Sequence, residues 1–247
     1  MASRNEILRT LNDWLAPDDF KDYCPNGLQV EGAEEVRTVI SGVTASRALV
    51  DAAIEADADM ILVHHGYFWK GEDQAIRGMK RDRIKRLLDH DINLVAYHLP
   101  LDDHPEYGNN RQLADVLGIL NPRPLGGLVW QGELGVPMGP QAFADLIGER
   151  LDRAPLWVGD GSAEIARVGW CTGAAQGFID SALNAGLDAY ISGEISEPTT
   201  HTARECGIHY YAAGHHATER YGVQALGRAV EQTFGVSHRF IDCDNPV

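Results

Sequence analysis

The sequence predicts an α/β protein of two similar lobes whose sheets are mainly parallel. Two stretches, one in each half of the chain, alternate between β-rich and helical runs, and strands alternating with helices of this length favour parallel sheets covered by helices. The strand, helix and strand are Val36–Val43, Ser46–Ala58 and Met60–Val63 in the first stretch, and Val168–Thr172, Ala174–Ala185 and Ala189–Ser192 in the second.

The two stretches also resemble each other. When the chain is shifted by 129 positions, Asp59 lies over Asp188 and His65 lies over Glu194. Asp51-Ala52-Ala53 likewise lies over Asp180-Ser181-Ala182. Chance recurrence of strand and helix composition is the alternative explanation. A true duplication would give two related halves that face each other.

The remaining segments complete two domains. Residues 1–17 carry apolar side chains at helical spacing and predict an amphipathic helix. The segment Asn121–Gly127 contains two prolines and two glycines, which favours a boundary. We therefore expect a first lobe over residues 1–124, a second lobe over 125–237, and a final strand within 238–247 that returns to the first lobe. Further expected elements are helices at Arg81–His90, Asn110–Leu117 and Ala217–Phe234, strands at Leu94–Tyr97, Ile208–Ala212 and His238–Asp242, and a loop at Leu99–Asn109.

The composition excludes several classes of protein. The chain of 247 residues has 36 acidic and 21 basic residues, a formal net charge of −15, which argues against duplex nucleic-acid binding. No apolar run approaches the ~20 residues that span a membrane, and the first helix lacks the apolar core of a signal peptide. The four scattered cysteines favour reduced thiols in the cytoplasm. The basic run Arg77–Arg86 is either a solvated helix face or a site for a small anion.

Histidines follow three apolar strands directly. In parallel α/β sheets, ligands bind beyond the carboxyl ends of the strands. A structural role is the alternative for any one histidine, but three such strand ends together favour a metal site. The histidines at these ends are His64, His65, His98, His215 and His216.

The spacing of nearby carboxylates supports metal binding. His215 and Glu219 are four residues apart at the start of a helix, so both side chains project from one face. Asp102 follows His98 by four residues, and we expect an extended turn there because Pro100 disfavours a regular helix. Imidazole and carboxylate together suit zinc, manganese, iron or nickel.

These residues predict a dinuclear site in the cleft between the lobes. Two divalent ions ~3.5–4 Å apart need a bridging carboxylate, for which we choose Glu219. Gly66 is expected to supply the backbone freedom for a bend after the paired histidines. The predicted metal ligands are His64, His65, Asp102, His215 and Glu219.

Four segments resemble the GTP cyclohydrolase 1 type 2 homologues, also called NIF-three-like dinuclear metal proteins. They are Pro25–Gly32 (PNGLQVEG), Ile61–Gly66 (ILVHHG), His98–Asp102 (HLPLD) and Gly214–Glu219 (GHHATE). The resemblance implies a two-lobed α/β fold, two divalent metal ions held between the lobes by the same five ligands, and a toroidal homohexamer. Gly66 stands where many members have proline, and Leu99 and Pro100 stand where many have threonine and asparagine; these departures alter the pocket wall and leave the ligands intact.

Two functions are compatible with such a site. The first is a divalent-metal-dependent hydrolase that acts on a small anionic, nucleotide-like substrate, at the C–N bonds of the purine ring if the family name describes its activity. His98, as proton shuttle or orienting residue, and Glu219 are then the candidate catalytic residues, and Tyr67, Trp69 and Glu194 are candidates for substrate contact. Packing is the alternative for the two aromatic residues. The second function is a non-enzymatic protein that binds metal or ligand for regulation or assembly.

Overall fold

A computed structural model describes residues 1–159, 161 and 163–247 and confirms the α/β class. The chain divides into two compact units. The first comprises Met1–Gly108 and Gly222–Asp244, and the second comprises Asn109–Tyr221 and Asn245–Val247. No helix in the described part of the chain is long and apolar enough to cross a membrane.

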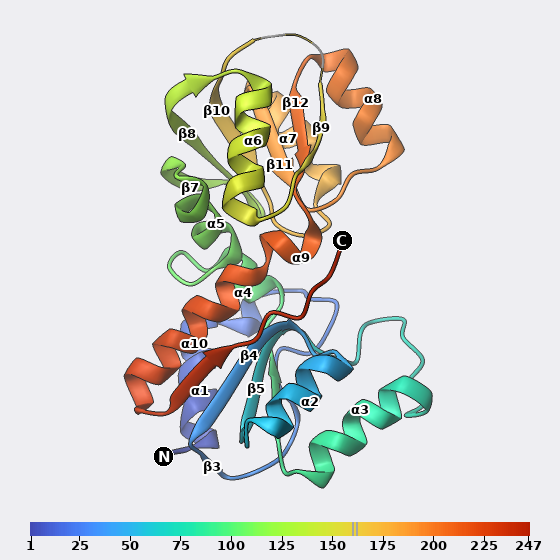
Figure 1. Cartoon of the computed structure of the whole chain (residues 1–247), viewed down its shortest axis with the longest axis vertical. Coiled ribbons are helices and arrows are strands. Elements are labelled where there is room, and N and C mark those ends of the chain that lie inside the picture. Colours follow the sequence, from blue (N-terminus) through green and yellow to red (C-terminus); the bar gives the residue numbers. More distant parts are fainter. Residues whose placement is uncertain (160, 162) are drawn as a thin grey trace. The chain divides into compact units, whose positions relative to one another are not determined.

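The first unit is a five-stranded sheet with helices on both faces (Figure 1). Its order is β13 (Ser237–Phe240), β4 (Thr38–Thr44), β5 (Met60–His65), β6 (Asn93–Ala96) and β2 (Gly27–Val30). All neighbours pair in parallel except β2, which is antiparallel to β6. Short strands β1 (Ala2–Ser3) and β3 (Glu35–Val36) form a separate pair, and a 3-10 turn covers Pro17–Asp19.

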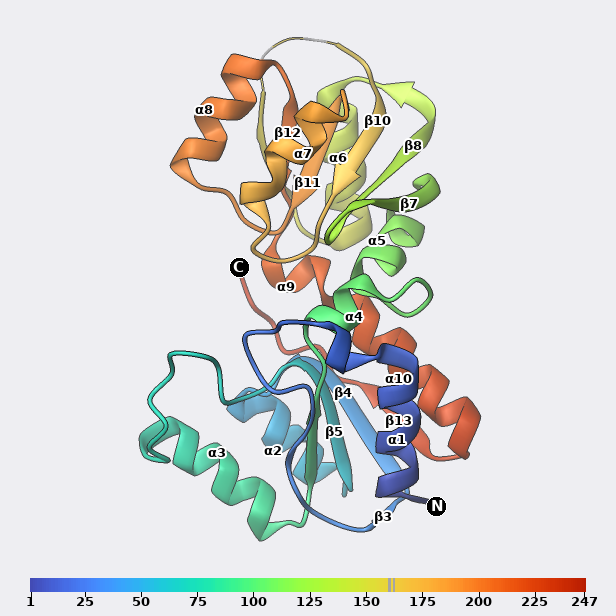
Figure 2. The same ribbon diagram turned by 180° about the vertical axis from the view of Figure 1, so that it is seen from behind.

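Alternating side chains of these strands fill two hydrophobic clusters, one on each face of the sheet. Val39, Met60 and Val95 pack with α1 (Arg4–Leu15) and α10 (Arg220–Phe234). Their neighbours Ile40, Ile61 and Leu94 pack with α2 (Arg47–Glu55) and α3 (Gly78–Asp89) on the opposite face (Figures 1 and 2). This alternation follows from the two-residue period of a strand. The short helix α4 (Leu99–Asp103) follows β6.

The second unit also has helices on both faces of its sheet, but this six-stranded sheet is mixed, with two parallel and three antiparallel strand pairs. Its order is β7 (Leu120–Gly126), β8 (Val129–Met138), β10 (Ile165–Trp170), β11 (Ala189–Ser192), β12 (His209–Ala212) and β9 (Leu156–Val158). The central strands β10, β11 and β12 are parallel, and the outer pairs are antiparallel. Helices α5 (Asn109–Leu117) and α6 (Pro140–Leu151) pack on one face, and α7 (Ile179–Asn184) and α8 (Glu197–Cys206) pack on the other. A 3-10 turn at Gln176–Phe178 precedes α7, and α9 (His215–Thr218) follows β12.

The internal similarity extends to the backbone register. Val39 pairs with Met60 in the first unit, and Val168 pairs with Ala189 at the positions 129 residues later. Asp59 Oδ2 accepts the N–H groups of Arg37 and Thr38 at 2.7 and 3.0 Å. Asp188 Oδ2 accepts those of Ala166 and Arg167 at 3.0 and 2.7 Å, again at an offset of 129. Each aspartate stands just before one strand and therefore ties the start of that strand to the start of its parallel neighbour.

Four expectations differ from the structure. The predicted connector Asn121–Gly127 forms β7, whose prolines are tolerated because it is an edge strand. The chain consequently passes between units at Gly108, not at residue 124, and all of Gly222–Asp244, not the final strand alone, belongs to the first unit. The predicted turn at Pro100 is helix α4, because Pro100 occupies the first helical turn, where its missing N–H is not needed.

Asp59→Ala and Asp188→Ala should each lower the free energy of unfolding by about 1–3 kcal/mol, because each substitution leaves two strand N–H groups without their charged acceptor. Urea unfolding followed by circular dichroism measures the change. Asp13→Ala, which removes an exposed carboxylate on α1, is the matched control and should have little effect. Unfolding midpoints for the two test variants equal to that of the control would contradict this role.

Candidate metal centre

In the first unit, the carboxyl ends of β5 and β6 bring three imidazoles together. His64 and His65 end β5, and His98 comes two residues after β6. One donor nitrogen from each ring lies within 4.8 Å of the others. Asp102, in α4, is buried with Oδ1 3.5 Å from His64 Nε2. The first unit therefore gathers the predicted ligands that lie within it.

In the second unit, a histidine and two carboxylates gather beyond β11 and β12. His215 opens α9, and its Nε2 lies 3.2 Å from Glu219 Oε2, as their four-residue spacing predicts. His215 Nδ1 lies 2.7 Å from Oε1 of Glu194, which stands two residues after β11. Burial lowers the pKa of His215, but hydrogen bonds and charge from Glu219 and Glu194 outweigh it and raise the pKa to about 9. The structure thus places Glu194 within hydrogen-bond distance of His215, a predicted metal ligand.

Each of the three predicted ligand histidines has its Nδ1 engaged by a protein oxygen. His64 Nδ1 is 2.9 Å from the carbonyl oxygen of Tyr97, and His65 Nδ1 is 3.3 Å from Thr44 Oγ1. His215 Nδ1 faces Glu194. An oxygen at Nδ1 fixes the orientation of the ring, and metal-binding histidines are commonly held in this way.

The distances within each group fit a metal ion. Around a tetrahedral ion with bonds of ~2.1 Å, neighbouring ligand atoms lie ~3.4 Å apart. The His64–Asp102 and His215–Glu219 separations are 3.5 and 3.2 Å. Imidazole nitrogen and carboxylate oxygen are also a donor set for divalent transition metals. The residues present therefore fit the predicted metals.

Two glycines of the second unit make room for its ligands. A Cβ on Gly173 would lie 2.2 Å from Glu219 Oε1, and one on Gly193 would lie 2.6 Å from His215 Cα. Neither residue was nominated from the sequence. The offset of 129 could have drawn attention to them, since Gly193 corresponds to His64 and Gly173 to Thr44.

Gly66 has a different role from the one expected. Its φ is not positive, so the bend after the paired histidines does not depend on glycine's conformational freedom. A Cβ there would instead lie 2.1 Å from Gln29 Oε1, the atom that accepts the Tyr67 N–H at 2.6 Å. Close packing against Gln29 is therefore what requires glycine.

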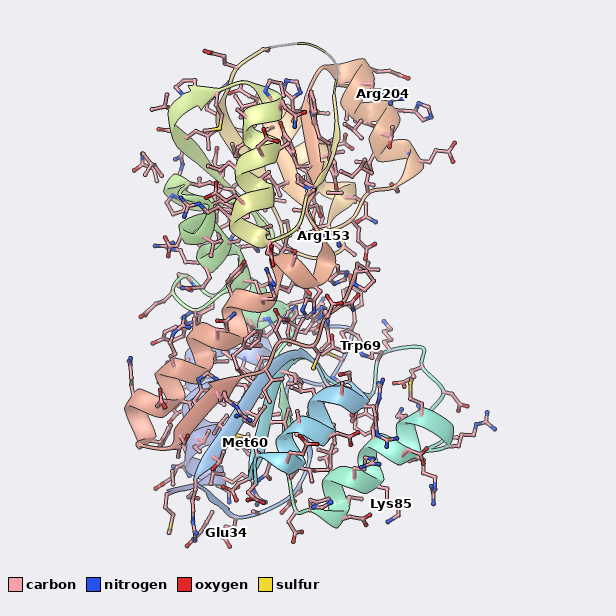
Figure 3. All side chains as sticks on the ribbon, viewed as in Figure 1. Glu34, Met60, Trp69, Lys85, Arg153 and Arg204 are labelled. Carbon is pink, nitrogen blue, oxygen red and sulfur yellow. The ribbon has the colours of Figure 1, made fainter. Side chains whose placement is uncertain are left out.

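The two aromatic candidates have different environments. Tyr67 is buried in the first unit's core, and its hydroxyl donates to the Ala45 carbonyl at 2.9 Å, which favours the packing alternative. Trp69, on the segment after β5 (Figure 3), is partly exposed and stands edge-on to His98 with ring centroids 5.0 Å apart. Between them, Phe68 has a φ of +66°, a conformation that costs a bulky residue energy.

Sequence reasoning missed Asp22 altogether. Its Oδ1 lies 2.6 Å from His98 Nδ1, and its Oδ2 accepts the Leu99 N–H at 2.9 Å. Burial raises the pKa of Asp22, but hydrogen bonds from His98 and Asn26 outweigh it and lower the pKa to about 2. No local motif marks Asp22, because it lies 76 residues from the histidine it contacts.

Comparisons with known proteins point to a single family. A family model described as Duf34/NIF3 (NGG1p interacting factor 3) matches residues 2–246. The chain is 59% identical over 245 residues to the GTP cyclohydrolase 1 type 2 homolog of Pseudomonas aeruginosa, covering 97% of each. It is 53% identical over 242 residues to the protein of the same name from Escherichia coli K12, covering 98% of each.

Solved structures of other proteins share this fold. The protein ybgI, described as of unknown function, matches with a TM-score of 0.97 at 52% identity, with 100% of both chains covered. TTHA1606 from Thermus thermophilus matches with a TM-score of 0.92 at 34% identity, also with 100% of both chains covered.

Gly173→Ala should weaken divalent-metal binding by at least ~10-fold, the range typical when the surroundings of a ligand are disturbed. The new methyl group would displace Glu219, and the φ of +69° adds strain for a residue with a Cβ. Chelator competition with Co²⁺ measures the affinity. Gly177→Ala is the matched control, because nothing lies within 4 Å of a Cβ there. Equal affinities for the two variants would show that the Gly173 contact does not position Glu219.

Proposed function

The chain belongs to the Duf34/NIF3 family, and from this premise we propose that it is a divalent-metal-dependent hydrolase of a nucleotide-like anionic substrate. It would bind two metal ions per chain through His64, His65, Asp102, His215 and Glu219. The ions would be zinc, manganese, iron or nickel, with Glu219 as the carboxylate shared by both.

The observation that carries this proposal is the engagement of Nδ1 in all three ligand histidines. An oxygen at Nδ1 orients the imidazole ring, which is how metal-binding histidines are commonly supported. The names of the relatives support a cyclohydrolase-like activity.

The charge of the loaded site supports an anionic substrate. Two divalent ions would bring four positive charges, of which the coordinating carboxylates Asp102 and Glu219 would offset two. The ions themselves would therefore attract an anion, although Glu194 and Asp22 add negative charge behind the histidine rings. The metal ions would supply Lewis acidity and a water of lowered pKa. The chain's own residues hold the donor atoms in place and orient the ligand rings.

The setting we propose follows from the sequence and the resemblance. We expect a cytoplasmic homohexamer that binds neither duplex nucleic acid nor membranes. The basic run on α3 supports the absence of a nucleic-acid surface, because several of its charges are already paired locally, as in Lys85–Asp89 and Arg86–Asp51. None of the four cysteines, all of which lie in the described part of the chain, forms a disulfide, which is compatible with a reducing compartment.

Elemental analysis should find close to two divalent ions per chain, and Glu219→Gln should lower metal affinity at least ~100-fold while changing fold stability little. The substitution keeps the side-chain shape and removes the charge that attracts the cations. The neighbouring His216→Ala is the matched control and should be milder, because His216 lies off the face shared by His215 and Glu219. A ratio of one ion or fewer after reconstitution would rule out the dinuclear site.

Metal-loaded protein should open the purine ring of at least one guanine or adenine nucleotide, with turnover reduced at least ~100-fold in Glu219→Gln, as expected when a catalytic group is removed. Liquid chromatography of the nucleotide and a formate assay follow the reaction. Nucleotide binding without turnover across the panel would favour the alternative, a non-enzymatic binding protein.

A further inference from the structure

We propose that Tyr23 and Trp69 form an aromatic subsite that binds a planar heteroaromatic ring of the purine type beside His98. The inference rests on the proposed function and deepens it, because it assigns recognition of the base to two side chains of the first unit. Tyr23 was not nominated from the sequence, which gave Trp69 as a candidate with packing as its alternative.

The first line of argument is the position of the two rings. The Tyr23 ring lies 6.2 Å from the His98 ring, between centroids, with an angle of 64° between the planes. The Trp69 ring lies 5.0 Å from the same imidazole at 84°, and 5.8 Å from that of His65 at 58°. Among the described residues, neither Tyr23 nor Trp69 has a face-to-face stacked partner. A planar ligand would provide that partner next to the imidazoles.

Tyr23 is an exposed aromatic residue on a fixed backbone. It is 60% exposed, yet its N–H donates to Asp22 Oδ1 and its carbonyl accepts the Lys70 N–H, both at 2.6 Å. Asp22 Oδ1 also lies 2.6 Å from His98 Nδ1, so one carboxylate fixes both the Tyr23 backbone and the neighbouring imidazole. The bond to Lys70 joins the segment of Tyr23 to that of Trp69. A pre-positioned aromatic ring binds a planar ligand with little loss of side-chain entropy.

The turn that carries Trp69 is held in a strained conformation. Phe68 has a φ of +66°, which costs a bulky residue energy. Lys80 Nζ lies 4.7 Å from the centroid of the Phe68 ring and 3.2 Å from Glu72 Oε2. The same glutamate oxygen accepts the Trp69 N–H at 3.1 Å, and the indole N–H donates to the Gly66 carbonyl at 3.2 Å. Strain of this kind persists only where the surroundings impose it, and it clusters at ligand-binding sites.

Lys80 is therefore a positioning residue for Trp69. Its side chain is 11% exposed, whereas that of Lys85, the other lysine of α3, is 54% exposed. Shielding from water strengthens both the cation–π contact with Phe68 and the ion pair with Glu72. One member of the basic run thus supports the turn beside the candidate metal centre.

An aromatic subsite has a defined selectivity. Stacking on an aromatic side chain tolerates any base, because every base has a π-face. The subsite should therefore favour nucleotides over sugar phosphates of the same charge, while it discriminates little between guanine and adenine. Ribose 5-phosphate, which lacks a ring to stack, is the matched probe for guanosine 5′-monophosphate.

The decisive experiment measures binding of both probes to the metal-loaded full chain by isothermal titration calorimetry. Tyr23→Ala and Trp69→Ala should each weaken guanosine 5′-monophosphate binding at least ~5-fold, the lower end of the effect of removing a stacking side chain. Their affinities for ribose 5-phosphate and for Co²⁺ should not change. Tyr23→Phe keeps the ring and should retain most of the nucleotide affinity. Phe178→Ala, which removes an exposed aromatic residue of the second unit, is the matched control.

The role of Lys80 is tested by a pair of variants. Lys80→Met removes the charge that holds Phe68 and Glu72, and it should weaken nucleotide binding while leaving ribose 5-phosphate binding unchanged. Lys80→Arg keeps a cation able to make both contacts and should restore the affinity. Circular dichroism of each variant shows whether it is folded.

The outcomes separate this inference from the proposed function. Nucleotide affinity that is unchanged in Tyr23→Ala and Trp69→Ala, or lost to the same degree as ribose 5-phosphate affinity, would overturn the inference. Turnover of nucleotides by those variants at the unmodified rate and KM would overturn it too and leave the proposed function standing. A chain that binds no Co²⁺ but binds guanosine 5′-monophosphate through these rings would refute the metal dependence and support the subsite.

Discussion

The parallel pairing of β4, β5 and β6, and of β10, β11 and β12, determines where every candidate ligand lies. Parallel strands in register end at the same edge of the sheet, so the residues that follow them are brought together although they are far apart in the chain. Asp59 and Asp188 hold this register at the opposite edge, where each accepts two N–H groups of the neighbouring strand. The residues at the carboxyl edge can therefore differ between the two units while the strand pairing stays the same.

The two units show what such exchange produces. β5 ends in His64-His65, whereas the corresponding residues after β11 are Gly193-Glu194. In the first unit these positions carry imidazoles. In the second unit, the glycine admits the backbone of His215 and the glutamate holds its ring. The same strand end therefore carries the candidate ligands themselves in the first unit. In the second unit it carries a glycine that leaves room for His215 and a glutamate that contacts the His215 ring, and His215 itself follows the next strand.

Sequence reasoning succeeded where the signal is local. The apolar run before His64 and His65 predicts a strand that ends at a site, and the four-residue spacing of His215 and Glu219 places both on one face, as the 3.2 Å contact shows. Sequence reasoning failed at prolines, whose effect on a helix or strand depends on where in that element they lie. Pro100 would break a helix interior but is accepted in the first turn of α4, and the prolines of β7 are accepted at a sheet edge.

The residues that support the ligands could not be predicted for a different reason. Asp22, Thr44 and the carbonyl of Tyr97 contact histidines through tertiary packing, and neither their type nor their spacing marks them in the sequence. Glu194 was nominated because the repeat aligned it with His65 and because it follows a predicted strand. Yet these oxygens restrict the rotation of each ring before an ion arrives, so metal binding loses less side-chain entropy. In the first unit the support of His98 is the carboxylate of Asp22, a stronger acceptor than the hydroxyl or carbonyl behind the paired histidines. The sequence marks His98 by its place after an apolar strand, but it gives no sign of the group that fixes the ring.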